Sequence, residues 1–386
     1  MKSGFLAIAK REFRRIFSSK ICIWGMLVVP VLSAAILMYM MQSGLPQKIP
    51  IAVVDLDNTS TTRTLIRQLD AFSKTDIKFK SLSFREARLR MESTEIYAIL
   101  YIPRNFTRDA ISGQQPKLVF YTDNAFYVSG NLLFQDLKTI GMLASASVGL
   151  KTALAKGFTE KQVMPILQPI TVESHPLGNP WVNYSICLNT SLIPAIFQLL
   201  LFMFTVSAFG SEVKSGTGKK LMEMGNNNYF TVILGKTIPY TIIFLLLSLL
   251  MIALMYWYQN FPLQTGFWPV YLDYFLLIIA SQGVGLIMVG VFQNYRMALS
   301  IASLFGMLAF SITGFSFPTE AMSPVLQAIS NLFPMRHFFL ISSSQALDGY
   351  RLSFVTFNII ALMCFAFVGL LTSSLVAKFL NSEYEE

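Results

Sequence analysis

One glycine-rich stretch of the chain carries lysines, as nucleotide-binding loops do. It reads Gly-Thr-Gly-Lys-Lys over residues 216–220. A phosphate-binding loop of the Walker A type has the pattern Gly-x-x-x-x-Gly-Lys-Ser/Thr, whose backbone N–H groups surround the phosphates. That pattern is absent from this stretch and from the rest of the sequence. We therefore expect this chain to bind no nucleotide cofactor of its own.

A pair of aspartates invites comparison with phosphoryl-transfer enzymes. The sequence Asp-Leu-Asp-Asn-Thr at residues 55–59 resembles the Asp-x-Asp-x-Thr start of haloacid-dehalogenase-type phosphatases. The resemblance implies that Asp55 would be a nucleophile and Asp57 a general acid. That chemistry also needs a later acidic cluster for Mg²⁺, and the candidate Asp123-Asn124 lacks the paired carboxylates. Asp and Asn after a strand are common in turns and helix caps, so a phosphatase-like external domain is the less favoured alternative.

Histidine and cysteine placement predicts neither a metal site nor a disulfide framework. His175 and His337 are far apart in the sequence and have no cysteine or histidine companions, whereas zinc sites need clustered ligands. Cys22, Cys187 and Cys364 all lie in apolar runs. The large polar segment has no cysteine, so no disulfide framework is expected.

The chain is far more apolar than a soluble domain of its length needs to be. Of its 386 residues, 54% are hydrophobic and 13% are charged, a composition typical of membrane proteins. Apolar runs about long enough to cross a bilayer lie at residues 21–41, 186–209, 232–258, 270–292, 298–315 and 354–379. We predict a polytopic α-helical membrane protein with six transmembrane helices and an inserted extracytoplasmic α/β domain.

Charged side chains avoid the middle of these runs. Glu212, Lys236 and Asp273 lie near the ends, whereas ion-coupled carriers and proton pumps usually carry ionisable groups deep in the membrane. We therefore expect this chain to be neither an ion-coupled carrier nor a proton pump. The net charge of +9 is concentrated at membrane edges, which favours contact with lipid headgroups over nucleic-acid binding.

The placement of basic residues predicts the orientation in the membrane. Short cytoplasmic connections are rich in Lys and Arg, and the polar stretch 210–230 carries three lysines. The connection 293–297 contains an arginine, whereas 260–269 contains neither residue type. We expect a multi-pass protein of the cell (inner) membrane with both termini in the cytoplasm.

Residues 1–20 have the pattern of a cytoplasmic, interfacial amphipathic helix. Apolar side chains recur at helical spacing, and the opposite face presents Lys10, Arg11, Arg14 and Arg15. Such a helix lies along the inner leaflet. A signal peptide is the alternative, but the following run 21–41 is long enough to span and lacks a convincing cleavage site, which favours an uncleaved first transmembrane helix.

Residues 42–185 are predicted to form the extracytoplasmic domain. Short β-rich runs alternate with amphipathic ones in the order β-α-β-α-β-α-β, and a helix follows over about residues 127–156. Residues 186–386 then hold transmembrane helices 2–6. Within them, 316–353 is apolar but interrupted by three prolines, which predicts short half-helices in the outer leaflet.

Small residues recur on two of the predicted spans. Such residues let helices approach closely, so we interpret them either as helix packing within the bundle or as a dimer seam. They are Ser281, Gly285, Ala298, Ala302 and Gly306.

The order of a basic helix, one span, a large external domain and five more spans resembles the ABC-2 type exporter permeases. It is most similar to their drug-efflux-like branch with a large extracytoplasmic domain. The resemblance covers essentially the whole chain and rests locally on Lys-Arg-Glu-Phe at 10–13, on residues 51–57 and 97–106, and on the Ser-Glu and Gly-Thr pairs within 211–217. The family usually has an acidic residue after the Gly-Thr pair and a Thr-Pro end to the loop, where this chain has Gly218 and Met224-Gly225.

The resemblance implies that residues 210–230 form a cytoplasmic coupling loop that docks on an ABC ATPase subunit. Its candidate residues are Glu212, Gly216, Thr217, Lys219 and Lys220. A second permease copy, identical or a sibling, is the other implied partner, with a periplasmic adaptor as a further candidate. The expected function is that of a non-enzymatic permease subunit that exports a hydrophobic or amphipathic molecule, such as a drug or a lipid. The alternative is a membrane receptor whose external domain senses a ligand.

Overall fold

The chain divides into two compact units, which we call the α/β unit and the helical bundle. The structure is a computed structural model that describes residues 4–168, 173, 175–180 and 182–382. Ser43–His175 forms the α/β unit, and Met1–Gln42 with Pro176–Glu386 forms the helical bundle. The α/β unit is therefore shorter at its C-terminal end than the predicted domain 42–185, because residues from Pro176 onward pack with the bundle.

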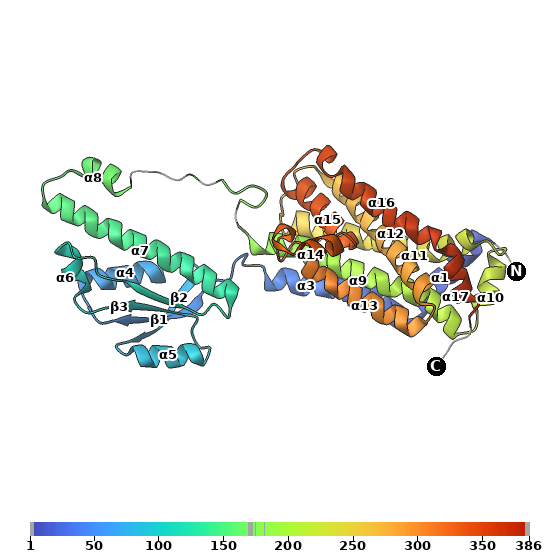
Figure 1. The fold of residues 1–386 in the computed structure, drawn as a ribbon, viewed down its shortest axis with the longest axis horizontal. Coiled ribbons are helices and arrows are strands. Elements are labelled where there is room, and N and C mark those ends of the chain that lie inside the picture. The colour runs from blue at the N-terminus through green and yellow to red at the C-terminus, as the bar shows by residue number, and fades with distance from the viewer. Residues whose placement is uncertain (1–3, 169–172, 174, 181, 383–386) are drawn as a thin grey trace. The chain divides into compact units, whose positions relative to one another are not determined.

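A four-stranded mixed sheet lies at the centre of the α/β unit (Figure 1). Its strands are β1 (Ile49–Asp55), β2 (Thr75–Ser81), β3 (Ala98–Ile102) and β4 (Val119–Thr122), in the order β2-β1-β3-β4. β1 pairs in parallel with β2 and β3, and β4 runs antiparallel to β3. Helices cover both faces of the sheet, so the central strand reads as a continuous apolar run.

Helices connect the strands in the alternating order that the sequence predicts. They are α4 (Ser60–Asp70), α5 (Phe84–Glu92), α6 (Phe106–Ile111), α7 (Tyr127–Ala155) and α8 (Glu160–Leu167). Leu65 and Leu69 of α4 and Leu133 of α7 form one apolar core with β1 and β3. Ala87 of α5 joins a smaller core on the opposite face. The unit therefore has three layers.

Among its described residues, the helical bundle contains five helices long and apolar enough to cross a membrane, or six if one bent pair counts as a single span. The first span combines α2 (Lys20–Ile23), the π-helix η1 (Trp24–Val28) and α3 (Val29–Met40). The next are α9 (Tyr184–Lys214), α11 (Tyr229–Ile252) continued by the π-helix η2 (Ala253–Tyr258), α12 (Phe267–Phe292) and α13 (Tyr295–Ile312). The bent pair is α16 (Thr356–Leu371) with α17 (Ser373–Leu380), which meet at 44°.

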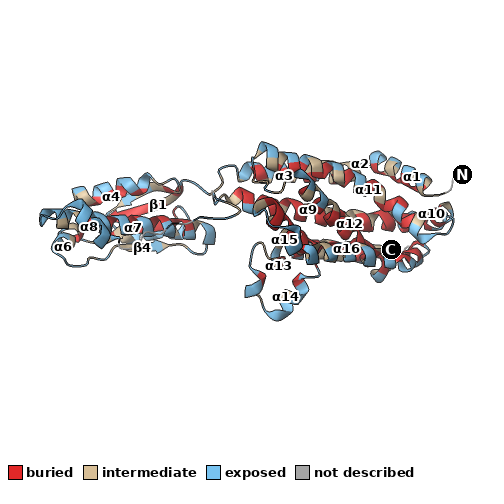
Figure 2. Ribbon diagram, turned by 90° about the horizontal axis from the view of Figure 1, so that it is seen from above, coloured by how far each residue is buried: buried red, intermediate tan, exposed pale blue. Residues whose placement is uncertain are grey.

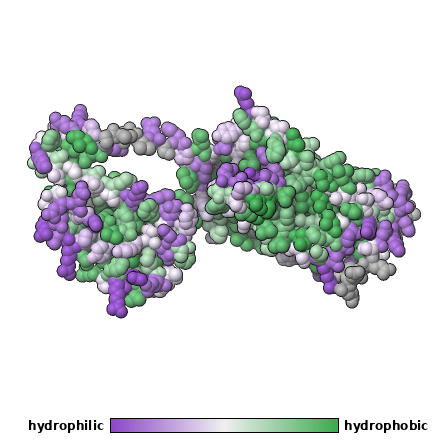
Figure 3. All heavy atoms as spheres, viewed as in Figure 1, coloured by the Kyte–Doolittle hydropathy of each residue, from purple (hydrophilic) through white to green (hydrophobic). Residues whose placement is uncertain are grey.

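The interior of the bundle is built around two of these spans. In their most apolar windows, 61% of α9 and 72% of α12 is buried, against 22% for the first span and for α13. Figure 2 shows the same contrast between the mostly buried α9 and α12 and the more exposed α3 and α13. Hydrophobic residues cover the middle of the bundle, and hydrophilic ones gather at the end that holds α10 (Gly218–Met224) (Figure 3). This distribution is that of a multi-pass membrane protein.

Short elements fill the two predicted interruptions of the bundle. In the region 316–353 the chain forms the 3₁₀ helix η3 (Thr319–Ala321), α14 (Pro324–Ser330), α15 (Pro334–Ser342), the π-helix η4 (Ser343–Leu347) and the start of the 3₁₀ helix η5 (Leu352–Phe354). The predicted loop 210–230 is largely helical, because α9 continues to Lys214 and α10 follows after a short turn. Glu212 therefore lies in the last turn of α9 and not in a loop.

The predicted small residues pack helices of the same chain against one another. A Cβ at Gly306 of α13 would lie 2.5 Å from Cδ1 of Leu199 of α9. A Cβ at Gly285 of α12 would lie 2.7 Å from Cβ of Thr205, also of α9. Ser281, Ala298 and Ala302 are buried beside them along the same helices. Gly285 and Gly306 thus let α12 and α13 approach α9 closely.

Candidate functional site

Helix α1 (Phe5–Ser18) lies against α11 at the end of the bundle that holds α10 (Figure 1). Close approach is possible because α11 has Gly235 at the contact, where a Cβ would lie 2.8 Å from Cβ of Ile8. Ile8 and Ile16 of α1 are both buried in the bundle core. The packing of these apolar residues thus fixes the position of α1 along α11, and with it the place where the charged residues of α1 meet α9 and α11.

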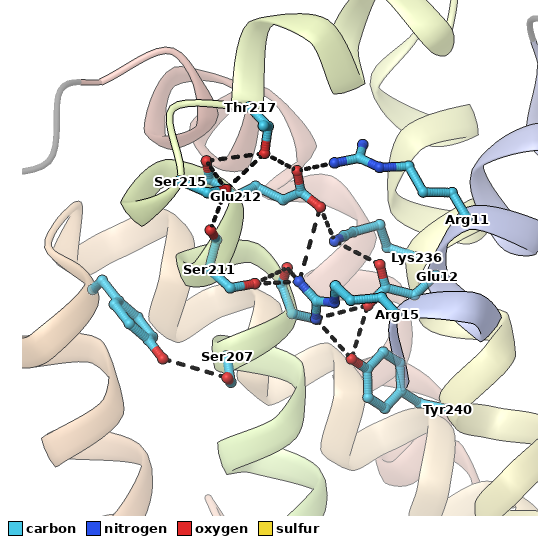
Figure 4. Close-up of polar contacts among 12 residues, drawn as sticks. Arg11, Glu12, Arg15, Ser207, Ser211, Glu212, Ser215, Thr217, Lys236 and Tyr240 are labelled. Carbon is cyan, nitrogen blue, oxygen red and sulfur yellow. Dashed lines mark hydrogen bonds and ion pairs between the residues drawn. The ribbon is translucent and has the colours of Figure 1, made fainter. Parts of the chain in front are cut away.

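Lys236 of α11 is fully buried and contacts two carboxylates from different helices. Its Nζ donates to Oε2 of Glu12 on α1 at 2.8 Å and to Oε1 of Glu212 on α9 at 2.7 Å. Both glutamate side chains are only 2% exposed. Three segments that are distant in sequence are therefore joined through one ammonium group (Figure 4).

Two arginines of α1 complete the arrangement. Arg11 Nη2 lies 2.6 Å from Oε2 of Glu212. Arg15 Nη2 lies 2.8 Å from Oε1 of Glu12 and 3.0 Å from the hydroxyl of Tyr240 on α11, which itself donates to Glu12 at 2.8 Å. We call Arg11, Glu12, Arg15, Glu212, Lys236 and Tyr240 the ionic cluster.

The ionic cluster holds three cations and two carboxylates. Removing charges from water costs several kcal/mol per ion, and only close, complete pairing offsets that cost. Burial by itself would lower the pKa of Arg15, but the neighbouring oxygens of Tyr240, Glu12 and Glu212 outweigh burial, and the pKa is raised. Arg15 therefore stays charged at any physiological pH. The cluster joins α1, α9 and α11, and withdrawal of either carboxylate leaves buried positive charge without a partner.

The turn between α9 and α10 is bound to this joint. Thr217 Oγ1 donates to Oε2 of Glu212 at 2.5 Å, and the Thr217 N–H donates to the Glu212 carbonyl at 2.9 Å. Gly216 precedes Thr217 with φ +66°, a left-handed conformation that glycine adopts without steric cost. The position of α10 is thereby linked to a carboxylate inside the cluster.

Helix α10 packs on the bundle by one face only. Leu221 and Met222 are buried, whereas Lys219, Lys220 and Glu223 are exposed. A Cβ at Gly218 would overlap the carbonyl oxygen of Leu380 at the end of α17. The Gly4 N–H donates to the carbonyl of Met224 at 2.8 Å, so the start of α1 contacts the end of α10. α10 is held between α1, α11 and α17 and presents a charged outer face.

The structure brings some of the predicted site residues together and separates others. Glu212, Gly216 and Thr217 lie side by side at the turn, whereas Lys219 and Lys220 lie on the exposed face of α10.

The four predicted cations of α1 also divide. Lys10 and Arg14 are exposed, but Arg11 and Arg15 enter the ionic cluster. The sequence places all four on the polar face of an interfacial helix, and in the structure two of them, Arg11 and Arg15, pair with buried carboxylates.

Sequence reasoning missed three members of the ionic cluster, namely Glu12, Lys236 and Tyr240. Two of them leave a signal that could have been used. Glu12 is the only acidic residue of the basic helix α1, and Lys236 is the only charged residue of the apolar helix α11. Glu12 and Lys236 carry opposite charges, and each is unusual for the segment that holds it. A charged residue in an apolar helix commonly pairs with another, so these two could have been predicted to pair.

The aspartates of the phosphatase-like motif have structural partners in the α/β unit. Asp55 Oδ1 accepts from the N–H groups of Asp57 and Asn58, and its Oδ2 accepts from the hydroxyl of Thr62 at 2.8 Å. Asp57 Oδ2 accepts from both the N–H and the hydroxyl of Thr107. These contacts are those of turn and cap residues, so the geometry does not favour a nucleophile at Asp55.

Comparison with known proteins agrees with the fold. The family model described as "ABC-2 family transporter protein" matches residues 20–375. The chain is 21% identical over 335 residues to the probable multidrug ABC transporter permease YbhR of Escherichia coli (strain K12), covering 86% of each chain. It is 22% identical over 359 residues to the linearmycin resistance permease protein LnrN of Bacillus subtilis (strain 168), covering 86% of this chain and 88% of that one. The chain therefore belongs to the ABC-2 family of transporter proteins and is an ABC-2 type exporter permease.

Proposed function

We propose that α10 is the place where a cytoplasmic ABC ATPase acts on this permease to drive export of a hydrophobic or amphipathic molecule. The observation that carries the proposal is the bond from the α9–α10 turn to the buried ionic cluster, through Thr217 and Glu212. A displacement of α10 would reach α9 directly, α11 through Lys236 and α1 through Arg11. ATP and Mg²⁺ would be bound by the ATPase subunit.

The charges at this end of the bundle support its assignment to the cytoplasm. Lys10, Arg14, Lys214, Lys219 and Lys220 are all exposed there, as the excess of Lys and Arg in cytoplasmic segments predicts. Both termini would then be cytoplasmic in the cell (inner) membrane, and the α/β unit would lie outside it. The exposed face of α10 is rich in cations, so we expect the ATPase to offer acidic residues to it.

The names of the two relatives suggest the class of substrate. YbhR is described as a multidrug permease and LnrN as a linearmycin resistance permease. Because this chain matches both over most of their length, we propose that its own substrate is an apolar or amphipathic compound. A second permease copy, identical or a sibling, would complete the pathway by covering part of the exposed apolar surface of α3 and α13. A periplasmic adaptor is a further candidate partner for the α/β unit.

Reconstitution tests the proposal. The purified chain in vesicles is expected to hydrolyse no ATP, and addition of its ATPase subunit is expected to give both hydrolysis and ATP-dependent movement of an amphipathic dye. An ATPase whose Walker A lysine is replaced serves as the control. Hydrolysis by the chain alone, with contaminating ATPases excluded, would contradict the assignment of ATP binding to a separate subunit.

A further inference from the structure

The α/β unit contains a pocket beside the phosphatase-like motif that has no part in the proposed coupling. It has a volume of about 600 Å³, within the range that small-molecule sites occupy. It opens between α4 and the carboxyl ends of β1 and β2. The residues that matter for its chemistry are Val53, Asp55, Arg63, Ile66, Arg67, Lys80 and Leu82.

Three cations line this pocket from two sides. Arg63 and Arg67 stand one turn apart on α4, and Lys80 lies on β2. Arg63 donates to the carbonyl of Asn58 at 2.9 Å, and Arg67 donates to the hydroxyl of Thr64 at 3.1 Å. Within the described part of the chain, no carboxylate forms an ion pair with any of the three. Most of their N–H donors are therefore available to a ligand.

One carboxylate, Asp55, also lines the pocket. Its two oxygens accept hydrogen bonds from the following turn and from Thr62, as described above. It therefore orients the start of α4 and does not pair with the arginines. The pocket keeps an excess of positive charge next to the N-terminal turn of an 11-residue helix, which also favours a negatively charged group.

The inner wall of the pocket is apolar. Val53 and Ile66 are buried, and Leu82 at the rim is 74% exposed. An exposed leucine beside a cationic pocket would gain from contact with an apolar group of the ligand. The combination suits a molecule that carries a negative group and a short hydrophobic part.

We propose that this pocket binds a phosphate ester that carries an apolar group, with the phosphate held by Arg63, Arg67 and Lys80. A doubly charged phosphate matches three cations better than a single carboxylate does, and guanidinium groups bind phosphate oxygens in pairs. Asp55 and Asp57 are occupied by the turn, so the ester is bound without being hydrolysed. This inference does not rest on the coupling role of α10.

Calorimetry on the full-length chain in nanodiscs of neutral lipid tests the inference. The probes are hexyl phosphate, inorganic phosphate and 1-hexanol. Hexyl phosphate is expected to bind saturably and more tightly than either of the others. The double variant Arg63→Gln/Arg67→Gln is expected to weaken its binding at least about tenfold, because charge-assisted hydrogen bonds to phosphate are lost.

A matched variant distinguishes the pocket from general charge. Arg85→Gln/Arg104→Gln removes two exposed arginines elsewhere in the α/β unit and is expected to bind hexyl phosphate like the unaltered chain. Lys80→Gln provides a second test on β2, away from the Arg63–Asn58 contact that helps to shape the turn. The proposal is overturned if inorganic phosphate binds as tightly as hexyl phosphate. It is equally overturned if hexyl phosphate does not bind or if Lys80→Gln and the double variant bind it like the control.

Discussion

Lys236 Nζ lies 2.7 Å from Oε1 of Glu212 and so joins α11 to the last turn of α9, inside the end of the bundle that holds α10. The same ammonium contacts Glu12, which lies 224 residues earlier in the chain. Because the ionic cluster has more cations than anions, removal of a carboxylate and removal of a cation have different consequences. Removal of a carboxylate leaves three cations with one anion, whereas removal of the lysine leaves two of each.

This imbalance predicts a ranking of stability effects. Glu212→Gln is expected to lower the free energy of unfolding by about 3–5 kcal/mol, since it leaves uncompensated buried charge. Lys236→Met is expected to cost only about 1–3 kcal/mol, because the carboxylates lose one donor but keep the arginines. Thermal unfolding in detergent measures both. The exposed Lys219→Met is the control and should stay within about 0.5 kcal/mol of the unaltered chain. A larger loss for Lys236→Met than for Glu212→Gln would contradict the described pairing.

The turn at Gly216 predicts an effect on coupling that depends on backbone conformation alone. Apart from its two chain neighbours, no residue that the structure describes has a heavy atom within 4 Å of a Cβ built at this glycine, but its φ is +66°. Gly216→Val should strain the turn by about 1–3 kcal/mol and reduce the dye transported per ATP hydrolysed. Gly216→Asn is the matched control, because asparagine tolerates the left-handed conformation. Equal transport by the two variants would show that the turn conformation is unimportant.

A side chain at Gly218, where α10 begins, is expected to disturb the packing of α10 against α17. A Cβ there would overlap the Leu380 carbonyl, so Gly218→Ala should push α10 away from α17. We expect a loss of about 1–3 kcal/mol in stability, as overpacking typically causes, together with weaker stimulation of the ATPase. Glu223→Ala, on the exposed side of α10, should leave stability unchanged. If Gly218→Ala unfolds at the same temperature as Glu223→Ala, the contact between α10 and α17 is not part of the fold.

Membrane orientation is tested by cysteine labelling. Single cysteines at Ser112 and Ser215, both exposed, are placed in a background lacking Cys22, Cys187 and Cys364. A membrane-impermeant maleimide should label residue 112 from outside the cell and residue 215 only in inside-out vesicles. Labelling of both from the same side would refute the proposed topology.

Much of the fold can be predicted from the sequence, because the period of apolar residues reports local structure directly. The alternating order of strands and helices is found in the α/β unit, and the helix predicted at about 127–156 matches α7 (Tyr127–Ala155). The end of α9 is different. The polar pair Ser211-Glu212 looks like the start of a loop, yet the helix continues to Lys214 because Glu212 is neutralised by Lys236 and Arg11.

The ionic cluster itself could not be predicted, since its pairs depend on which helices meet. Arg11 and Arg15 have the spacing of a lipid-facing cationic surface, and only the docking of α1 on α11 turns them inward. Lys236, the charged residue of an apolar helix, is the clearest indication in the sequence that a carboxylate must lie nearby. Its two partners, however, come from helices that lie 224 and 24 residues earlier in the sequence.

Cross-linking from α10 shows whether the ATPase docks on this helix. A photoreactive amino acid is placed at Lys220 in the complex of permease and ATPase, and at Gln264, in the connection between η2 and α12, as the control. We expect a cross-linked product with the ATPase subunit from residue 220 and none from residue 264, and a reduced yield in Gly216→Val. Absence of any product from residue 220, with a product instead from a site such as residue 14 on α1, would contradict the claim that force enters through α10.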